Sequence, residues 1–509
     1  MLGEGQGSLS QQDLPERRAL PPARRRLLQP AGDLEVPVRR EPELTGQRGK
    51  TGVVAGVGHE TAPPPRKPSA HPRDGHEKGT YNRPSPIEDP PMRWRVRRIG
   101  RLCLLACTGL PAAADDWPRW RGPANDGHIP AGVPVPKALP AEPKEVWKVP
   151  VGDGLGSPVA SGGKVFLLDH QEGREVVHAL DAATGKEAWR APLDEVFKDN
   201  QSVPGPRSTP VVDGDRVYVQ SCRGEFRCLR VADGKPVWGV NFVKDFQAVF
   251  IGEQGQATGA SRHGYTGSAL VDGERLYVGV GGPAGASLVC FNKADGKVIW
   301  KSQNDVPGYA GPVLATIAGV RHVVSFTAEG VIGLDAATGA LLWREPMRTA
   351  FGRHVTTPVV VGDTVIVSSH QVGLVGVRVT KAGETVKAER AWTEKASAIN
   401  VSSPVAVGAH IYGLGPGKKL VCVEARTGRQ AWAQKEFANQ DHASFLVAGD
   451  RILALTDGGQ LVLFAADPSA YREVGRAQVC GKTWCNPAYA GGRLFLRDDR
   501  SLRCVQLVP

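Results

Sequence analysis

Tryptophans recur through this chain at a regular spacing. Seven of its 11 tryptophans follow one another at intervals of 40 to 62 residues, and similar segments precede most of them, such as HALDAATGKEAW before residue 190 and IGLDAATGALLW before residue 344. Self-similarity of this length marks a repeat architecture in which each repeat is one supersecondary unit. The spaced tryptophans are Trp147, Trp189, Trp238, Trp300, Trp343, Trp392 and Trp432.

Each repeat is predicted to contain four strands. SPVASGGKVFLL from Ser157 and TPVVDGDRVYV from Thr209 join Val-rich runs through Gly, which is typical of β-hairpins. In the segment from Asp181 to Trp189, the Asp can cap a turn and Gly185 can supply a positive φ. The Trp then lies on the outer strand, where its ring can fill the gap to the next sheet. We therefore interpret the seven tryptophans as structural residues.

The number of repeats indicates a closed ring. Repeats of about 40–50 residues with four strands are the size of propeller blades. Six sets run from Ser157 to Trp432, a seventh ends near Val479, and an eighth begins at Asn486 but lacks its outer strand. A lone strand at residues 145–149 can supply it, which would leave no open sheet edge. The predicted fold is all-β, an eight-bladed β-propeller of four-stranded antiparallel blades over residues 145–509, closed by its N- and C-terminal strands.

The repeat motif resembles that of a known family. Residues 179–189 match A-x-D-x-x-T-G-x-x-x-W in full, and residues 335–343 match it nearly. The chain is therefore similar to the PQQ-like β-propellers (pyrroloquinoline-quinone repeat, quinoprotein alcohol dehydrogenase-like), and specifically to their non-catalytic BamB-like branch. The resemblance covers about residues 145–509 and specifies a fold more than a function.

The residues before the repeats, 1–144, have a different composition and no repeat pattern. Residues 1–91 contain 15 of the 40 prolines and several Arg clusters, so we expect them to be disordered. Residues 92–114 have the layout of a signal peptide, with five arginines, a short apolar run and three alanines. This layout favours a translation start at Met92, and a genuine disordered pro-region is the alternative. Residues 115–144 are a leader whose Trp117 to Gly127 part resembles the leader of exported relatives.

Both interpretations of residues 92–114 predict export to the periplasm or cell envelope. Cleavage after Ala114 would release the chain, whereas Leu104 to Cys107 resembles a lipobox that would place a lipid anchor on Cys107. No apolar run approaches the roughly 20 residues of a membrane-spanning helix.

The net charge of +11 gives no support for a nucleic-acid partner. Residues 1–114 hold 19 Lys and Arg against 12 Asp and Glu, which leaves only about +4 for the rest of the chain.

The cysteines are predicted to be mostly core residues. Cys228, Cys290, Cys422 and Cys504 occupy one equivalent strand position. Disulfides between Cys222 and Cys228 and between Cys480 and Cys485 remain open.

The family resemblance implies two classes of function. Its enzymes hold PQQ and Ca²⁺ in the propeller mouth and usually carry a disulfide between adjacent cysteines, which this sequence lacks. The approximately 395 residues after Ala114 suffice for eight minimal blades without the enzymes' long insertions. We predict a non-catalytic binding or protein-interaction scaffold without a cofactor. The alternatives are a PQQ-dependent dehydrogenase and a BamB-type outer-membrane assembly factor.

A candidate site follows from propeller geometry. Residues just before each blade's first strand line the channel mouth, where they could bind a small polar ligand or an envelope protein. They could equally well only plug or solvate the channel, and we predict no metal site from the two histidines among them. The candidates are Arg207, Tyr265, Tyr309, Arg353, His354, Asn400, Asp441, His442 and Trp484.

The longest insertion, residues 239–265, carries Phe242, Phe246 and Phe250 ahead of a Gly-rich tail. Its aromatic residues could form a docking edge or fold over their own blade.

Overall fold

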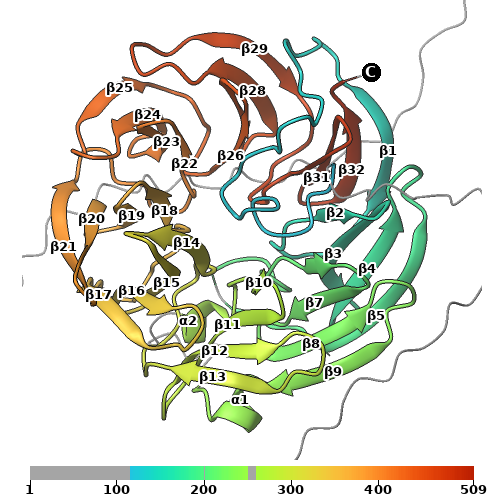
Figure 1. The fold of residues 1–509 in the computed structure, drawn as a ribbon. Helices are drawn as coiled ribbons and strands as arrows, with labels where there is room; N and C mark the ends of the chain where they lie inside the picture. Colours follow the sequence, from blue (N-terminus) through green and yellow to red (C-terminus); the bar gives the residue numbers. More distant parts are fainter. Residues whose placement is uncertain (1–114, 200, 250–259, 509) are drawn as a thin grey trace, which may run out of the picture. The chain divides into compact units, whose positions relative to one another are not determined.

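Eight four-stranded antiparallel sheets form a ring around a central channel (Figure 1). The computed structural model describes residues 115–199, 201–249 and 260–508. The predicted extension 1–91, the signal peptide 92–114 and Cys107 lie outside these residues. For the described part of the chain, the predicted eight-bladed propeller is confirmed.

Blades one to seven each consist of four consecutive strands, numbered from the channel outward. Blade one has β2 (Val159–Ser161), β3 (Lys164–Gln171), β4 (Arg174–Asp181) and β5 (Glu187–Glu195). Blade two has β6 (Val211–Asp213), β7 (Arg216–Gln220), β8 (Glu225–Arg230) and β9 (Pro236–Asn241). Blade three has β10 (Leu270–Asp272), β11 (Arg275–Gly282), β12 (Ala286–Asn292) and β13 (Val298–Ser302). Blade four has β14 (Val313–Ile317), β15 (Val320–Thr327), β16 (Gly330–Asp335) and β17 (Leu341–Pro346).

The second half of the ring repeats this order until the last blade. Blade five has β18 (Val359–Val361), β19 (Thr364–Ser369), β20 (Gly373–Ala382) and β21 (Thr385–Glu394). Blade six has β22 (Val405–Val407), β23 (His410–Gly415), β24 (Lys419–Glu424) and β25 (Gln430–Gln434). Blade seven has β26 (Ala443–Ala448), β27 (Arg451–Thr456), β28 (Gln460–Ala465) and β29 (Glu473–Gln478). Blade eight has β30 (Ala488–Ala490), β31 (Arg493–Arg497) and β32 (Ser501–Gln506), with β1 (Lys144–Pro150) as its outer strand.

The two ends of the propeller close the ring together. Strand β1 pairs antiparallel with β32, from Lys144 opposite Gln506 to Pro150 opposite Ser501. The Arg497 side chain, 1% exposed, donates to the carbonyls of Gly152, Gly156 and Leu168, so it links blade eight to blade one. The predicted closure by the N- and C-terminal strands is confirmed.

Tryptophans on the outer strands join seven of the eight blades to their neighbours, whereas β29, the outer strand of blade seven, has none. The Trp189 indole donates from Nε1 to the Val231 carbonyl of blade two at 2.9 Å. Its ring lies against Gly234, whose φ is +69° and where a Cβ would stand 2.6 Å from the ring. The same contact joins Trp147 to Gly185, Trp238 to Gly296, Trp300 to Gly339 and Trp392 to Gly428. Trp343 is different, because its buried Nε1 has no partner among the described residues.

The turn that presents this glycine is capped by its aspartate. The Asp181 carboxylate accepts hydrogen bonds from the backbone of Ala183 and Thr184, at 3.1 and 2.9 Å, and from the Thr184 hydroxyl at 2.7 Å. An Asx turn of this kind fixes the backbone that approaches the indole.

The cysteines in the described part of the chain are all buried thiols. Cys228 on β8 lies in register between Tyr218 on β7 and Trp238 on β9, within the blade core. The two disulfides that the sequence left open are absent here, since Cys222, Cys228, Cys480 and Cys485 are all free.

The leader packs into the ring. Trp117 is 1% exposed and pairs with Ala160 of β2 through two backbone hydrogen bonds. The Arg119 side chain donates to the Val271 carbonyl of blade three, and Arg121 donates to the Pro404 carbonyl just before β22 of blade six. Figure 1 shows the start of this segment, in cyan, over the inner strands.

The insertion after blade two folds back onto its surroundings. It contains α1 (Phe242–Phe246) and α2 (Ala260–His263). Phe242 is buried edge-on against Tyr265, and Phe246 packs on Phe291 of blade three. This arrangement favours the folded-over alternative for these two rings, whereas Phe250 lies outside the described residues. Within the described residues, neither helix is long and apolar enough to cross a membrane.

Candidate ligand site at the channel mouth

A cavity of about 570 Å³ lies at the mouth of the channel, within the size range of small-ligand sites. Residues from all eight blades and from the leader line it. Seven of the nine residues that the sequence proposed are among them: Arg207, Tyr309, Arg353, Asn400, Asp441, His442 and Trp484.

The other two proposed residues, Tyr265 and His354, lie outside the lining. His354 is fully buried, stacks on Phe326 at 4.2 Å between ring centroids, and contacts the Thr327 carbonyl through Nδ1. Burial lowers the pKa of His354 to about 4. Neighbouring residues of an extended segment point to opposite sides, so Arg353 takes the channel position that His354 cannot.

Tyr265 is displaced in the same way. Its ring is buried against Phe242, and the next residue, Thr266, lines the cavity instead. Thr266 donates from its hydroxyl to the Tyr309 carbonyl at 2.9 Å, which links blade three to blade four.

The inner wall is formed by hydroxyl residues at the starts of the first strands. The Thr209 amide donates to Ser268 Oγ at 3.1 Å, and the Thr357 amide donates to Ser403 Oγ at 3.0 Å. Each bond joins one blade to the next. In the sequence these residues mark strand starts, and they are not among the nine channel candidates. Their recurrence before Pro or Ala in blades one, two, three, five and six is the signal that could place them there.

Trp120 of the leader also lines the cavity. Its Nε1 donates to the Thr357 hydroxyl of blade five at 3.0 Å. No local pattern predicts this contact, which joins residues 237 positions apart.

Arg207 is neutralised by its neighbours. Its guanidinium lies 3.0 Å from Asp199, which also accepts from His263 Nδ1 at 2.9 Å, and 5.2 Å above the centre of the Phe197 ring. Although burial alone would raise it, the hydrogen bond from His263 and the charge of Arg207 help to lower the pKa of Asp199 to about 2. Burial lowers the pKa of His263, so we expect a neutral ring that donates from Nδ1.

Several polar atoms around the cavity have no partner. They are buried and lack a hydrogen bond to any described residue, although buried polar atoms are normally paired. A ligand with complementary donors and acceptors would satisfy them. The atoms are Tyr309 Oη, His263 Nε2, Asn400 Oδ1 and His442 Nδ1.

The lining does not fit the PQQ and Ca²⁺ site of the enzymes. Ca²⁺ takes six to eight oxygen ligands, with carboxylates prominent among them. Among the described lining residues, Asp441 is the one carboxylate, and it is exposed. Three or more His, Cys, Asp or Glu side chains do not gather into a metal-binding group anywhere in residues 115–199, 201–249 and 260–508.

The comparison with known proteins places the chain in a family. The family model described as "Outer membrane protein assembly factor BamB" matches residues 137–239 and 174–434. The chain belongs to the PQQ-like propeller family. The resemblance predicted from residues 179–189, including its BamB-like branch, is thereby confirmed.

Individual relatives agree with this assignment. This PQQ-like propeller is 23% identical to outer membrane protein assembly factor BamB of Shewanella oneidensis over 392 residues, which cover 72% of this chain and 89% of the relative. The BamB of Yersinia pestis is also 23% identical, over 62% of this chain and 79% of its own. These names agree with the prediction of a non-catalytic scaffold.

A solved structure supports the fold alone. Quinohemoprotein alcohol dehydrogenase of Comamonas testosteroni superposes with a TM-score of 0.51 at 13% identity, covering 77% of this chain and 81% of the enzyme.

Proposed function

We propose that this protein is a BamB-type scaffold that takes part in outer-membrane protein assembly at the periplasmic side of the cell envelope. The observation that carries the proposal is the match to the Shewanella BamB over 89% of that protein's length. The similarity therefore spans nearly a whole assembly factor and not merely a few shared repeats.

The mouth of the channel is the face that we expect to contact partners. Long loops between the blades end there, and three of their apolar side chains are exposed: Val203 at 45%, Phe351 at 36% and Trp484 at 39%. Exposed apolar groups beside a polar cavity suit protein contact. The ring behind them is closed and fastened from blade to blade, so these loops are held on a rigid support.

The proposal is tested by purifying the tagged full chain from its native envelope after mild cross-linking, with mass spectrometry of what accompanies it. We expect components of an outer-membrane assembly complex, and lower amounts of outer-membrane proteins when the chain is depleted. The F351S/W484S variant should lose these partners, whereas V298S on the outer strand β13 should keep them. Absence of envelope partners together with unchanged outer-membrane proteins would contradict the proposal.

A lipid on Cys107 would hold such a scaffold at the membrane, and we include it in the proposal. Intact-mass measurement of the native protein distinguishes a lipidated N-terminus at Cys107 from cleavage after Ala114. Addition of PQQ and Ca²⁺ tests the enzyme alternative, because stoichiometric uptake with dye reduction would replace the scaffold assignment.

A further inference from the structure

The charges of three arginines and of Asp199 act on the hydroxyl group of Tyr309. Burial raises the pKa of Tyr309, and the positive charges of Arg262, Arg353 and Arg207 act against this shift. Their side chains come from α2, from the loop before β18 and from the loop before β6, and so from different parts of the sequence. Because Asp199 offsets only one of these three positive charges, the surroundings of Tyr309 carry a net positive charge.

Two of these charges are not neutralised within the described part of the chain. Arg207 is paired with Asp199, as described above. Arg262 lies over the Phe351 ring at 4.2 Å, and its buried Nη1 has no hydrogen-bond partner there. The exposed Arg353 guanidinium makes no hydrogen bond or ion pair with another described residue. This side of the mouth can accept an anionic group without breaking an existing ion pair.

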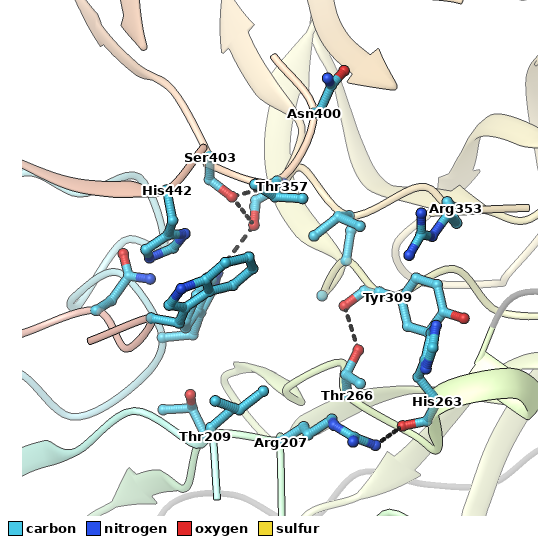
Figure 2. Close-up of a pocket in the computed structure, with 18 of the residues that line it drawn as sticks. Arg207, Thr209, His263, Thr266, Tyr309, Arg353, Thr357, Asn400, Ser403 and His442 are labelled. Carbon is cyan, nitrogen blue, oxygen red and sulfur yellow. Dashed lines mark hydrogen bonds between the residues drawn. The ribbon is translucent and has the colours of Figure 1, made fainter. Parts of the chain in front are cut away.

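The geometry of a guanidinium suits an oxyanion. It can form two parallel hydrogen bonds to a carboxylate or a phosphate group. Tyr309 Oη, which is unpartnered, can donate a further bond to the same group. Figure 2 shows Arg353, Tyr309 and His263 along one side of the cavity, with His442 across from them.

Two of the other unpartnered atoms require hydrogen-bond donors. In a neutral His263 ring that donates from Nδ1, the free Nε2 is an acceptor, and the free Asn400 Oδ1 is an acceptor as well. A simple inorganic anion offers such atoms no donors. Hydroxyl groups on the ligand would supply them, and a cavity of about 570 Å³ has room for a molecule that carries both kinds of group.

We propose that the channel mouth binds a small hydroxylated organic acid, with its carboxylate on Arg353 and Tyr309 and its hydroxyl groups on His263 and Asn400. The site goes beyond the proposed assembly function and does not depend on it. Free phosphate shares part of this chemistry, so the test separates the two.

Calorimetry of the purified full chain at constant ionic strength tests the ligand class. Gluconate carries both groups, glucose only the hydroxyls, propionate only the carboxylate, and inorganic phosphate only an oxyanion. We expect gluconate to bind at least about tenfold more tightly than each of the others. Equal binding of gluconate and glucose, of gluconate and propionate, or binding of phosphate as tight as that of gluconate, would overturn the proposal.

Variants test the assigned atoms. R353Q and Y309F should weaken gluconate about tenfold or more, the scale of one charged hydrogen bond. N400A should reduce the preference for gluconate over propionate. R190Q changes a 63% exposed arginine on β5 and serves as the matched control. Because Arg353 is exposed and unpaired, R353Q should keep the melting temperature of the parent, and an unchanged affinity in that folded variant would refute the assignment. These binding measurements do not involve envelope partners. The ligand proposal can therefore fail while the proposed assembly function holds, and the reverse is also true.

Discussion

Tyr218 on β7 and Trp238 on β9, the two strands that flank β8 in blade two, donate to the same acceptor in blade three. Tyr218 Oη and Trp238 Nε1 each lie 3.0 Å from the Lys293 carbonyl oxygen. Blade three repeats the arrangement, since Tyr277 and Trp300 both donate to the Ala336 carbonyl of blade four, at 3.0 and 3.4 Å. One carbonyl with two donors retains a partner when either donor is removed, which makes the joint between blades redundant.

This redundancy predicts that the effects of two substitutions are not additive. W238F and Y218F should each cost about 1–2 kcal/mol of unfolding free energy, from a lost hydrogen bond and changed packing. The double variant should cost more than the sum, because it leaves the Lys293 carbonyl buried without either donor. Denaturant unfolding of the four proteins measures the difference, and simple additivity would show that the shared carbonyl is unimportant.

The glycine that faces Trp238 provides a second test. Gly296 has φ +73°, and an added Cβ would stand 2.5 Å from the indole. Gly273 in the same blade also has a positive φ, +54°, but open space around it. G273A should therefore lower the unfolding free energy by about 1–2 kcal/mol, the strain of placing a non-glycine residue at a positive φ. G296A should lower it clearly more, because its Cβ also collides with the indole. If thermal unfolding shows equal decreases in melting temperature for G273A and G296A, the indole moves aside freely.

The sequence predicted the blades because each repeat encodes its own contacts. The Asp181 turn and the glycine after it are local features, and the indole that they receive recurs in every blade except the seventh, so both strand order and ring closure follow from periodicity. The Trp343 joint is the exception, since blade five has a longer β20–β21 hairpin in place of the motif and leaves that indole nitrogen unpartnered.

The mouth was less predictable because its geometry depends on alternation. The positions just before the first strands predict the right loop in blades two to eight, but a shift of one residue decides whether a side chain enters the cavity or the core. Arg353 enters it and His354 does not. Trp120 and His263 reach the mouth from the leader and from the insertion, which no repeat pattern describes.

A buried carboxyl group in blade one should make stability depend on pH. Glu175 is fully buried, accepts a hydrogen bond from the Cys222 amide, and has its pKa raised to about 7, chiefly by burial. Between pH 4.5 and 7 the folded protein holds this proton and the unfolded chain releases it, so stability falls as pH rises through this window. Above pH 7 the buried, ionised Glu175 lowers the unfolding free energy by about 3 kcal/mol relative to its value at low pH.

The E175Q variant should remove that dependence. Its unfolding free energy at pH 8 should exceed that of the parent, whereas the two should differ less at pH 5. E172Q, which changes an exposed carboxyl in the preceding turn, should have the same unfolding free energy as the parent at both pH 5 and pH 8. Parallel pH profiles for the parent and E175Q would exclude Glu175 as the titrating group.

The closure of the ring rests on Arg497. Its three carbonyl partners belong to blade one and to the segment that leads into it, and they would lose their donor in R497M. We expect a loss of about 3–5 kcal/mol, as for other buried charged groups whose partners are left unpaired. R500M, at an exposed arginine three residues on, should cost less than about 0.5 kcal/mol. Chemical denaturation measures both unfolding free energies. Similar losses in R497M and R500M would contradict a role of Arg497 in closing the ring.

The leader should stabilise the propeller as much as one of the blade tryptophans does. Trp117 lies in the same apolar cluster as Leu167 of blade one and Leu494 of blade eight, and so it packs at the joint where the ring closes. Truncation in W117A removes a fully buried indole and should cost about 3–5 kcal/mol. W484A, at the half-exposed mouth, should cost much less, because little of its ring is withdrawn from water. If W117A unfolds at the same denaturant concentration as the parent, the leader is a dispensable tail. If it unfolds as early as W238A, the propeller must include residues from 117 onward.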